Sequence, residues 1–283
     1  MCDCISKEDL QYIVGKAIEW FDANEEKSID WRLARKAVKG ESRQGERDEV
    51  KDYILSRINN NSNNNSNNNS SNIETFIKYM YNNIQNYDVE KDILLFLISW
   101  NIQRFDSILR EYDGKEEYIE KWLRAIRSIN EYIEREGENK SYEEIFRCVL
   151  YQYRQVTNAQ EKVIIAKTLL VMDPNKFAAW DNQIIDIFFG KLNLSIEKKY
   201  DLFNKAIDKF LSECDLEKCL EELDTRYGYE YGRKKLLDMI LYIYANGKIL
   251  DDCRFICNAC KIVCAISIYL CKLFKNRVRC NTS

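Results

Sequence analysis

Five cysteines near the end of the chain are spaced regularly enough to suggest a shared chemical role. They are Cys253, Cys257, Cys260, Cys264 and Cys271, separated by 4, 3, 4 and 7 residues, so on a helix their sulfurs lie along one stripe. A continuous helix rises 1.5 Å per residue and already spreads the first four sulfurs, from Cys253 to Cys264, over about 16 Å, too far for one tetrahedral metal site. We therefore expect no bound metal and expect the cysteines to pack as small apolar side chains. Disulfide pairing of the stripe with cysteines near either end of the chain stays open.

Basic residues follow the stripe. They are Lys272, Lys275, Arg277 and Arg279, and they could contact nucleic acid or an anionic surface, or simply solubilise an apolar terminus. The chain has no histidine. This excludes Ser-His-Asp triads, Cys-His dyads and HExxH zinc sites, since each of them needs an imidazole.

A second stretch of interest runs from Lys162 to Asp181 and reads KVIIAKTLLVMDPNKFAAWD. Its apolar residues recur with a helical period as far as Met172. Pro174 ends that helix because proline lacks an amide hydrogen and disfavours helical geometry at the residue before it. A further apolar run closes at Gly190, a typical residue after a helix end. Asp181 is therefore expected to cap the N-terminus of that helix.

The same stretch resembles the core of the helix-hairpin-helix DNA glycosylases. In that family a lysine, an apolar helix, a short loop and an aspartate that opens another helix follow in this order with similar spacing; here Lys162 and Asp181 are 19 residues apart. The Leu237-Asp238 pair also looks like part of a late helix in some archaeal members. The family's hairpin before the lysine is glycine-rich, whereas residues 156–161 contain no glycine.

The resemblance implies a base-excision glycosylase and AP lyase that acts on damaged DNA without a cofactor. Lys162 would attack the sugar carbon as a neutral amine and form a Schiff base. Asp181 would stabilise the developing positive charge. The target base would be flipped into a pocket, with Trp180 as a candidate for stacking on it. Lys167, in the same helix, would bind substrate and competes with Lys162 for the nucleophile's role.

Composition predicts an all-α, multi-helix globular bundle, and leaves open two helical subdomains that flank a cleft. One proline and nine glycines in 283 residues are too few for the frequent turns of an all-β fold. The net charge of −3 lacks the basic surplus usual in DNA-binding domains. The alternative function is therefore a non-catalytic all-helical binding or interaction protein.

Residues 59–72 read NNNSNNNSNNNSSN and cannot bury a core, so they predict a flexible loop or linker. This divides the chain into an N-terminal helical segment, 1–58, and a main all-α domain, 73–283, with the cysteine-striped helix at its end. The N-terminal residues show no signal peptide, and the apolar run 93–98 is too short to span a bilayer. We therefore expect a cytoplasmic protein without a membrane partner.

Overall fold

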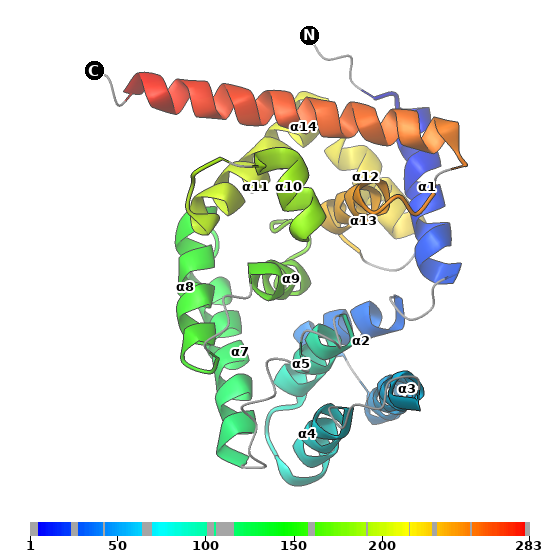
Figure 1. Ribbon diagram of the computed structural model, residues 1–283, viewed down its shortest axis with the longest axis vertical. Helices are drawn as coiled ribbons and strands as arrows, with labels where there is room; N and C mark the ends of the chain where they lie inside the picture. Colours follow the sequence, from blue (N-terminus) through cyan, green and yellow to red (C-terminus); the bar gives the residue numbers. More distant parts are fainter. Residues whose placement is uncertain are drawn as a thin grey trace. The chain divides into compact units, whose positions relative to one another are not determined.

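The computed structural model describes residues 5–23, 28–41, 43–63, 70–100, 105, 116–157, 162–190, 192–214, 216–227, 231–249 and 251–280. Within these residues the chain forms thirteen helices and no strand. Figure 1 labels these helices along the ribbon. The all-α class predicted from the scarcity of proline and glycine is confirmed.

The helices are numbered in chain order. Those before residue 140 are α1 (Lys7–Ala23), α2 (Ser28–Val38), α3 (Gln44–Asn63), α4 (Ser70–Asn83), α5 (Asp88–Trp100) and α7 (Glu116–Glu136). Those after it are α8 (Tyr142–Arg154), α9 (Lys162–Met172), α10 (Asn182–Phe189), α11 (Ile196–Glu213), α12 (Glu217–Tyr227), α13 (Arg233–Ala245) and α14 (Cys253–Cys280).

Helical structure extends into both ends of the asparagine-rich tract. α3 continues to Asn63 and α4 begins at Ser70, so residues 59–63 and 70–72 do not form the loop predicted for them, and the residues between lie outside the described part. The physical reason is that a helix already nucleated, in α3 before the tract or in α4 after it, propagates at little cost, and asparagine penalises each added residue by less than about 1 kcal/mol.

Contacts divide the chain into two compact units. Unit 1 comprises residues 1–24, 141–146 and 165–283, and unit 2 comprises residues 25–140 and 147–164. Helix α8 therefore begins in unit 1 and ends in unit 2, and helix α9 begins in unit 2 and ends in unit 1. The limits of these two units differ from the domain boundaries predicted at residues 58 and 73. Whether the predicted segments are independent domains stays a prediction.

Unit 1 is built around α13, which packs against α1, α10, α12 and α14. α1 supplies an apolar stripe of six buried side chains and begins after Ser6, whose hydroxyl accepts a hydrogen bond from the amide of Asp9 at 3.1 Å. The stripe consists of Leu10, Ile13, Val14, Ala17, Ile18 and Phe21. α14 packs one face on α11, α1 and α13.

Unit 2 is built around α5, which packs against α2, α3, α4 and α7. Its apolar run, residues 93–98, is entirely buried, as expected for a core helix. Trp31 of α2 meets Phe96 at a ring-centroid distance of 5.9 Å. The buried carboxylate of Asp92 is paired with Arg47 of α3, with Nε and Oδ2 2.9 Å apart.

The start of α13 is fixed by close backbone contact with the loop after α9. Gly232 has a φ of 77°, in the region that side chains disfavour. A Cβ atom added there would lie 2.8 Å from the Cβ of Pro174. The amide of Lys234 donates to the carbonyl of Pro174 at 3.0 Å. Glycine is therefore required at this position on both conformational and steric grounds.

We predict that Gly232→Ala lowers the free energy of unfolding by about 2–4 kcal/mol, the sum of backbone strain and overpacking against Pro174. The matched control is Gly45→Ala in α3, where an added Cβ has no atom within 4 Å; it should be neutral or stabilise by up to about 1 kcal/mol. Urea unfolding followed by far-UV circular dichroism measures both. Equal midpoints for the two variants would contradict the assigned role of Gly232.

Candidate functional site

Asp181 is the N-cap of α10, as the sequence predicts. Its Oδ1 accepts a hydrogen bond from the amide of Ile184 at 2.8 Å, and its Oδ2 accepts one from Nδ2 of Asn246 at 3.0 Å. The helix ends at Gly190, whose amide donates to the carbonyl of Asp186. Both carboxylate oxygens of Asp181 thus hold parts of unit 1 together.

Trp180 lies in an aromatic core and not in a pocket. Its side chain has no exposed surface. Four rings surround the indole, at centroid distances of 5.2 Å for Tyr200, 5.6 Å for Phe203, 6.2 Å for Phe189 and 6.4 Å for Phe146. All of these rings belong to unit 1. Such packing indicates that the indole stabilises the fold.

The two lysines proposed as nucleophiles occupy different environments. Lys162, half-buried, is the first residue of α9 and belongs to unit 2, whereas Asp181 belongs to unit 1. Their convergence on one site stays a prediction. Lys167 belongs to unit 1 and is only 2% exposed.

Lys167 takes part in a buried cluster of charged groups. Its Nζ lies 3.2 Å from Oδ2 of Asp238 on α13. The Nζ of Lys235, one turn earlier on α13, lies 3.0 Å from the same oxygen and 5.1 Å from the ring centroid of Phe21. All three charged side chains are almost fully buried. The structure thus joins Lys167 to Asp238, the aspartate of the Leu237-Asp238 pair, 71 residues away.

Electrostatics keep the carboxylate of this cluster ionised. Burial by itself raises the pKa of Asp238, but the nearby charges of Lys167 and Lys235 and their hydrogen bonds outweigh it and hold the pKa below its usual value. A carboxylate held between two ammonium groups acts as their counter-ion. The cluster therefore ties α9 to α13.

A second buried lysine network lies beside the first. The Nζ of Lys234 is 2.6 Å from Oδ1 of Asp208 and donates to the hydroxyl oxygen of Tyr142 at 3.0 Å. That hydroxyl in turn donates to Oδ2 of Asp208 at 2.7 Å. Burial lowers the pKa of Lys234, and Asp208 opposes this shift. Two consecutive lysines at the start of α13 thus bind different carboxylates.

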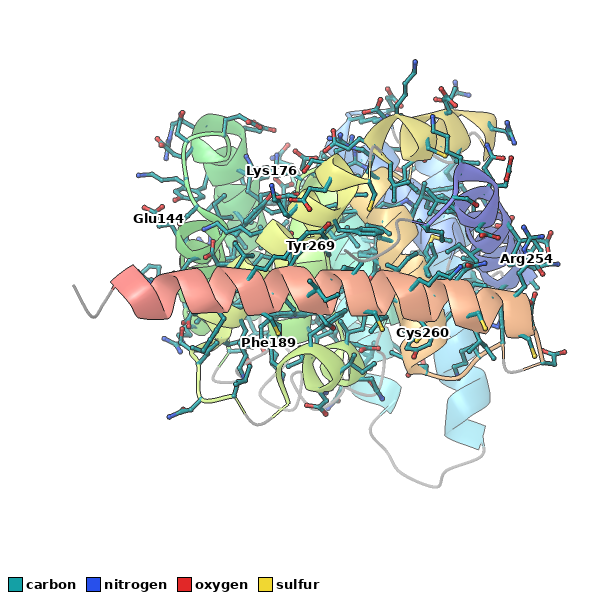
Figure 2. The ribbon with its side chains drawn as sticks, turned by 90° about the horizontal axis from the view of Figure 1, so that it is seen from above. Glu144, Lys176, Phe189, Arg254, Cys260 and Tyr269 are labelled. Atoms are coloured by element: carbon teal, nitrogen blue, oxygen red, sulfur yellow. The ribbon has the colours of Figure 1, made fainter. Side chains whose placement is uncertain are left out.

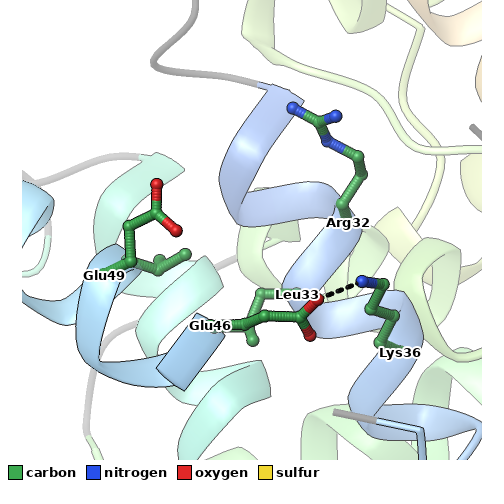
Figure 3. Close-up of a pocket in the computed structure, with 6 residues that line it drawn as sticks. Arg32, Leu33, Lys36, Glu46 and Glu49 are labelled. Carbon is green, nitrogen blue, oxygen red and sulfur yellow. Dashed lines mark hydrogen bonds and ion pairs between the residues drawn. The ribbon is translucent and has the colours of Figure 1, made fainter. Parts of the chain in front are cut away.

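A pocket of about 300 Å³ lies between α2 and α3 in unit 2 (Figure 3). It is lined by Arg32, Leu33, Lys36, Glu46, Glu49 and Val50. Lys36 forms an ion pair with Glu46. Two basic and two acidic side chains balance one another around it, so the pocket does not select an anion such as phosphate.

The cysteine stripe lies on the outside of unit 1. α14 has an outer face, defined here as Cys253, Cys257, Cys260, Cys264, Ser267, Ile268, Cys271 and Phe274. Four of its five cysteines are exposed and Cys260 is half-buried, so the prediction that they pack as apolar side chains is wrong. The reason is that the opposite face has larger apolar side chains, including Phe255, Ile262 and Ile266, which bury more surface against α11, α1 and α13. In Figure 2, α14 lies nearest to the viewer, in front of the other helices of unit 1.

In the part of the chain that the structure describes, none of the five cysteines of this face forms a disulfide bond. The sulfurs of Cys260 and Cys264 are 4.0 Å apart, about twice the length of a disulfide bond. Among the described residues, no group of three or more potential ligands is close enough to hold a metal ion.

α14 also contains a segment, Cys253–Phe274, that is long and apolar enough to cross a membrane, with a mean hydropathy of 1.7 over its most apolar window. Of that window, 44% is buried within the protein. The core helix of a folded domain passes the same test, so length and composition do not by themselves indicate a membrane span.

Comparisons with protein-family models, with curated proteins and with solved structures gave no match for this chain.

Proposed function

We propose that the chain is a non-catalytic, all-helical binding protein whose binding surface is the outer face of α14. The observation that carries this proposal is the exposure of four cysteines together with Ile268, 40% exposed, and Phe274, 37% exposed, along one helix. Exposed apolar side chains that gather on one face mark interaction sites more often than isolated ones do. The opposite face of the same helix is buried in the core of unit 1.

The structural roles of two candidate site residues, one predicted as catalytic and one as substrate-binding, support the same proposal. Asp181 caps α10 and is bonded to Asn246, and Trp180 fills an aromatic core. Neither side chain is left over for a reacting sugar or a flipped base. The acidic net charge is also what a protein that does not bind DNA is expected to have.

The second candidate function is the lysine chemistry of a DNA glycosylase and AP lyase. One specific observation favours it: Lys167, Asp238 and Lys235 meet within 3.2 Å. An amine beside a carboxylate and a second cationic group is an arrangement that Schiff-base enzymes use. In this version Lys167 is the nucleophile and Asp238 replaces Asp181 as its partner. A sugar aldehyde would reach Lys167 only after the side chains that cover it move.

Borohydride trapping separates the two functions. The full-length chain is incubated with DNA that carries an abasic site, in the presence of borohydride, which reduces any Schiff base to a permanent link. We expect no covalent adduct from the natural sequence, and none from Lys162→Gln or Lys167→Gln. An adduct that Lys167→Gln removes and Lys162→Gln retains would overturn the binding proposal in favour of the enzyme. Loss in Lys162→Gln alone would instead identify Lys162 as the nucleophile.

A further inference from the structure

The charge pattern of α14 indicates what kind of partner its outer face fits. The helix contains six lysine and arginine residues and no aspartate or glutamate over its 28 residues. Arg254 is paired with Asp9 of α1. Lys261 and Lys272 are exposed beside the outer face, the first bonded to Asn258 and the second 4.9 Å from the ring centroid of Tyr269. A partner of complementary charge is therefore anionic.

A second copy of the chain fits this face poorly. The cysteine spacing of 4, 3, 4 and 7 matches the seam of a coiled coil, which would allow two α14 helices to pair. Each α14 has no carboxylate of its own, however, so pairing would bring Lys261 and Lys272 of one copy towards those of the other with no acidic partner on the helices, and like charges across such an interface are destabilising. The exposed apolar side chains flanked by lysines therefore favour a partner with an apolar interior and a negatively charged surface.

The packing of α14 within unit 1 determines whether the helix would cross such a partner or lie along its surface. Its inner face is buried against α11, α1 and α13 and includes the polar side chain of Asn258. Crossing a bilayer would expose that face to lipid and uncover the core of unit 1. Lying along the surface requires neither change. A helix of 28 residues offers about 42 Å of contact length at 1.5 Å per residue.

We propose, resting on the binding function above, that the outer face of α14 docks on an anionic lipid bilayer. The exposed side chains Ile268 and Phe274 and the cysteines enter the boundary between headgroups and acyl chains, as in other interfacial helices. Lys261 and Lys272 face the negative headgroups, where each basic residue strengthens binding about five-fold. This partner departs from the expectation, drawn from sequence, that no membrane is involved.

The test is sedimentation of the reduced, full-length chain with vesicles of phosphatidylcholine, alone or with about one third phosphatidylserine. We expect binding to the anionic vesicles only, and its loss as salt rises from about 0.05 to about 0.5 M. Ile268→Glu should weaken binding at least about ten-fold, and Lys272→Glu at least about five-fold. The matched control is Ile187→Glu on α10, since Ile187 is 43% exposed; it should bind like the natural sequence.

Maleimide labelling gives a second measurement that needs no substitution. Anionic vesicles should protect Cys257, Cys264 and Cys271 from the reagent, as read by peptide mass. No binding, no protection, or equal binding by Ile268→Glu and Ile187→Glu would each overturn the lipid proposal. Self-association that Ile268→Glu abolishes, without vesicle binding, would also overturn it, yet would leave α14 as the binding surface. An adduct in the borohydride experiment would overturn the binding function itself.

Discussion

Replacing Asp238 by asparagine is expected to lower the free energy of unfolding by about 3–5 kcal/mol, the usual cost of removing one partner from a buried ion pair. The variant keeps the shape of the side chain but leaves the ammonium groups of Lys167 and Lys235 in the core without this carboxylate. Urea unfolding at neutral pH measures the loss. The matched control is Glu19→Gln, which breaks an exposed ion pair with Lys16 on α1 and should cost less than about 1 kcal/mol.

The effect of Asp238→Asn should also depend on pH. The folded protein holds the pKa of Asp238 below its usual 3.8, so the unfolded chain binds a proton to this group more readily. The stabilisation is therefore complete above about pH 5 and is lost as the pH falls through the folded-state pKa. The difference between the natural sequence and the variant should shrink between about pH 5 and pH 2. A difference that stays constant over this range would contradict the assigned ion pair.

Trp180→Ala is expected to cost about 3–5 kcal/mol, because removal of a fully buried indole loses its transfer free energy and leaves a cavity among four aromatic rings. The control is Tyr151→Ala on α8, since Tyr151 is 62% exposed; its cost should lie within about 0.5 kcal/mol of zero. Far-UV circular dichroism in urea gives both values. A Trp180→Ala variant as stable as the natural sequence would return the indole to the list of candidate pocket residues.

Local features of the chain were predictable from sequence because their causes are local. Pro174 ends α9, Asp181 caps α10, and Gly190 closes α10. Each of these effects involves backbone groups within four residues of the one that causes it. The all-α class follows from composition for the same reason, since turns and sheets need residues that the chain lacks.

The outer face of α14 and the buried ion pairs could not be predicted from sequence, because they depend on contacts between residues far apart in the chain. The spacing of the cysteines gives one stripe on a helix, but the choice of the buried face depends on what packs against α14. One signal was present: the opposite stripe contains Phe255, Ile262 and Ile266, which bury more apolar area than thiols do. The pairing of Lys167 with Asp238 joins residues 71 positions apart. Two lysines in succession at the start of α13 gave no indication of which carboxylate each would meet.

The hydrogen bond between α1 and the residue that precedes α14 has a consequence for synthesis on the ribosome. The hydroxyl of Tyr12 on α1 donates to the carboxylate of Asp252, 240 residues later, and α13 and α14, on which α1 packs, also come late. At about 5–20 residues per second, translation leaves the nascent α1 without these partners for roughly ten seconds to most of a minute. During that interval its apolar stripe is open to chaperones, and unit 1 can complete its core only after α14 has been translated.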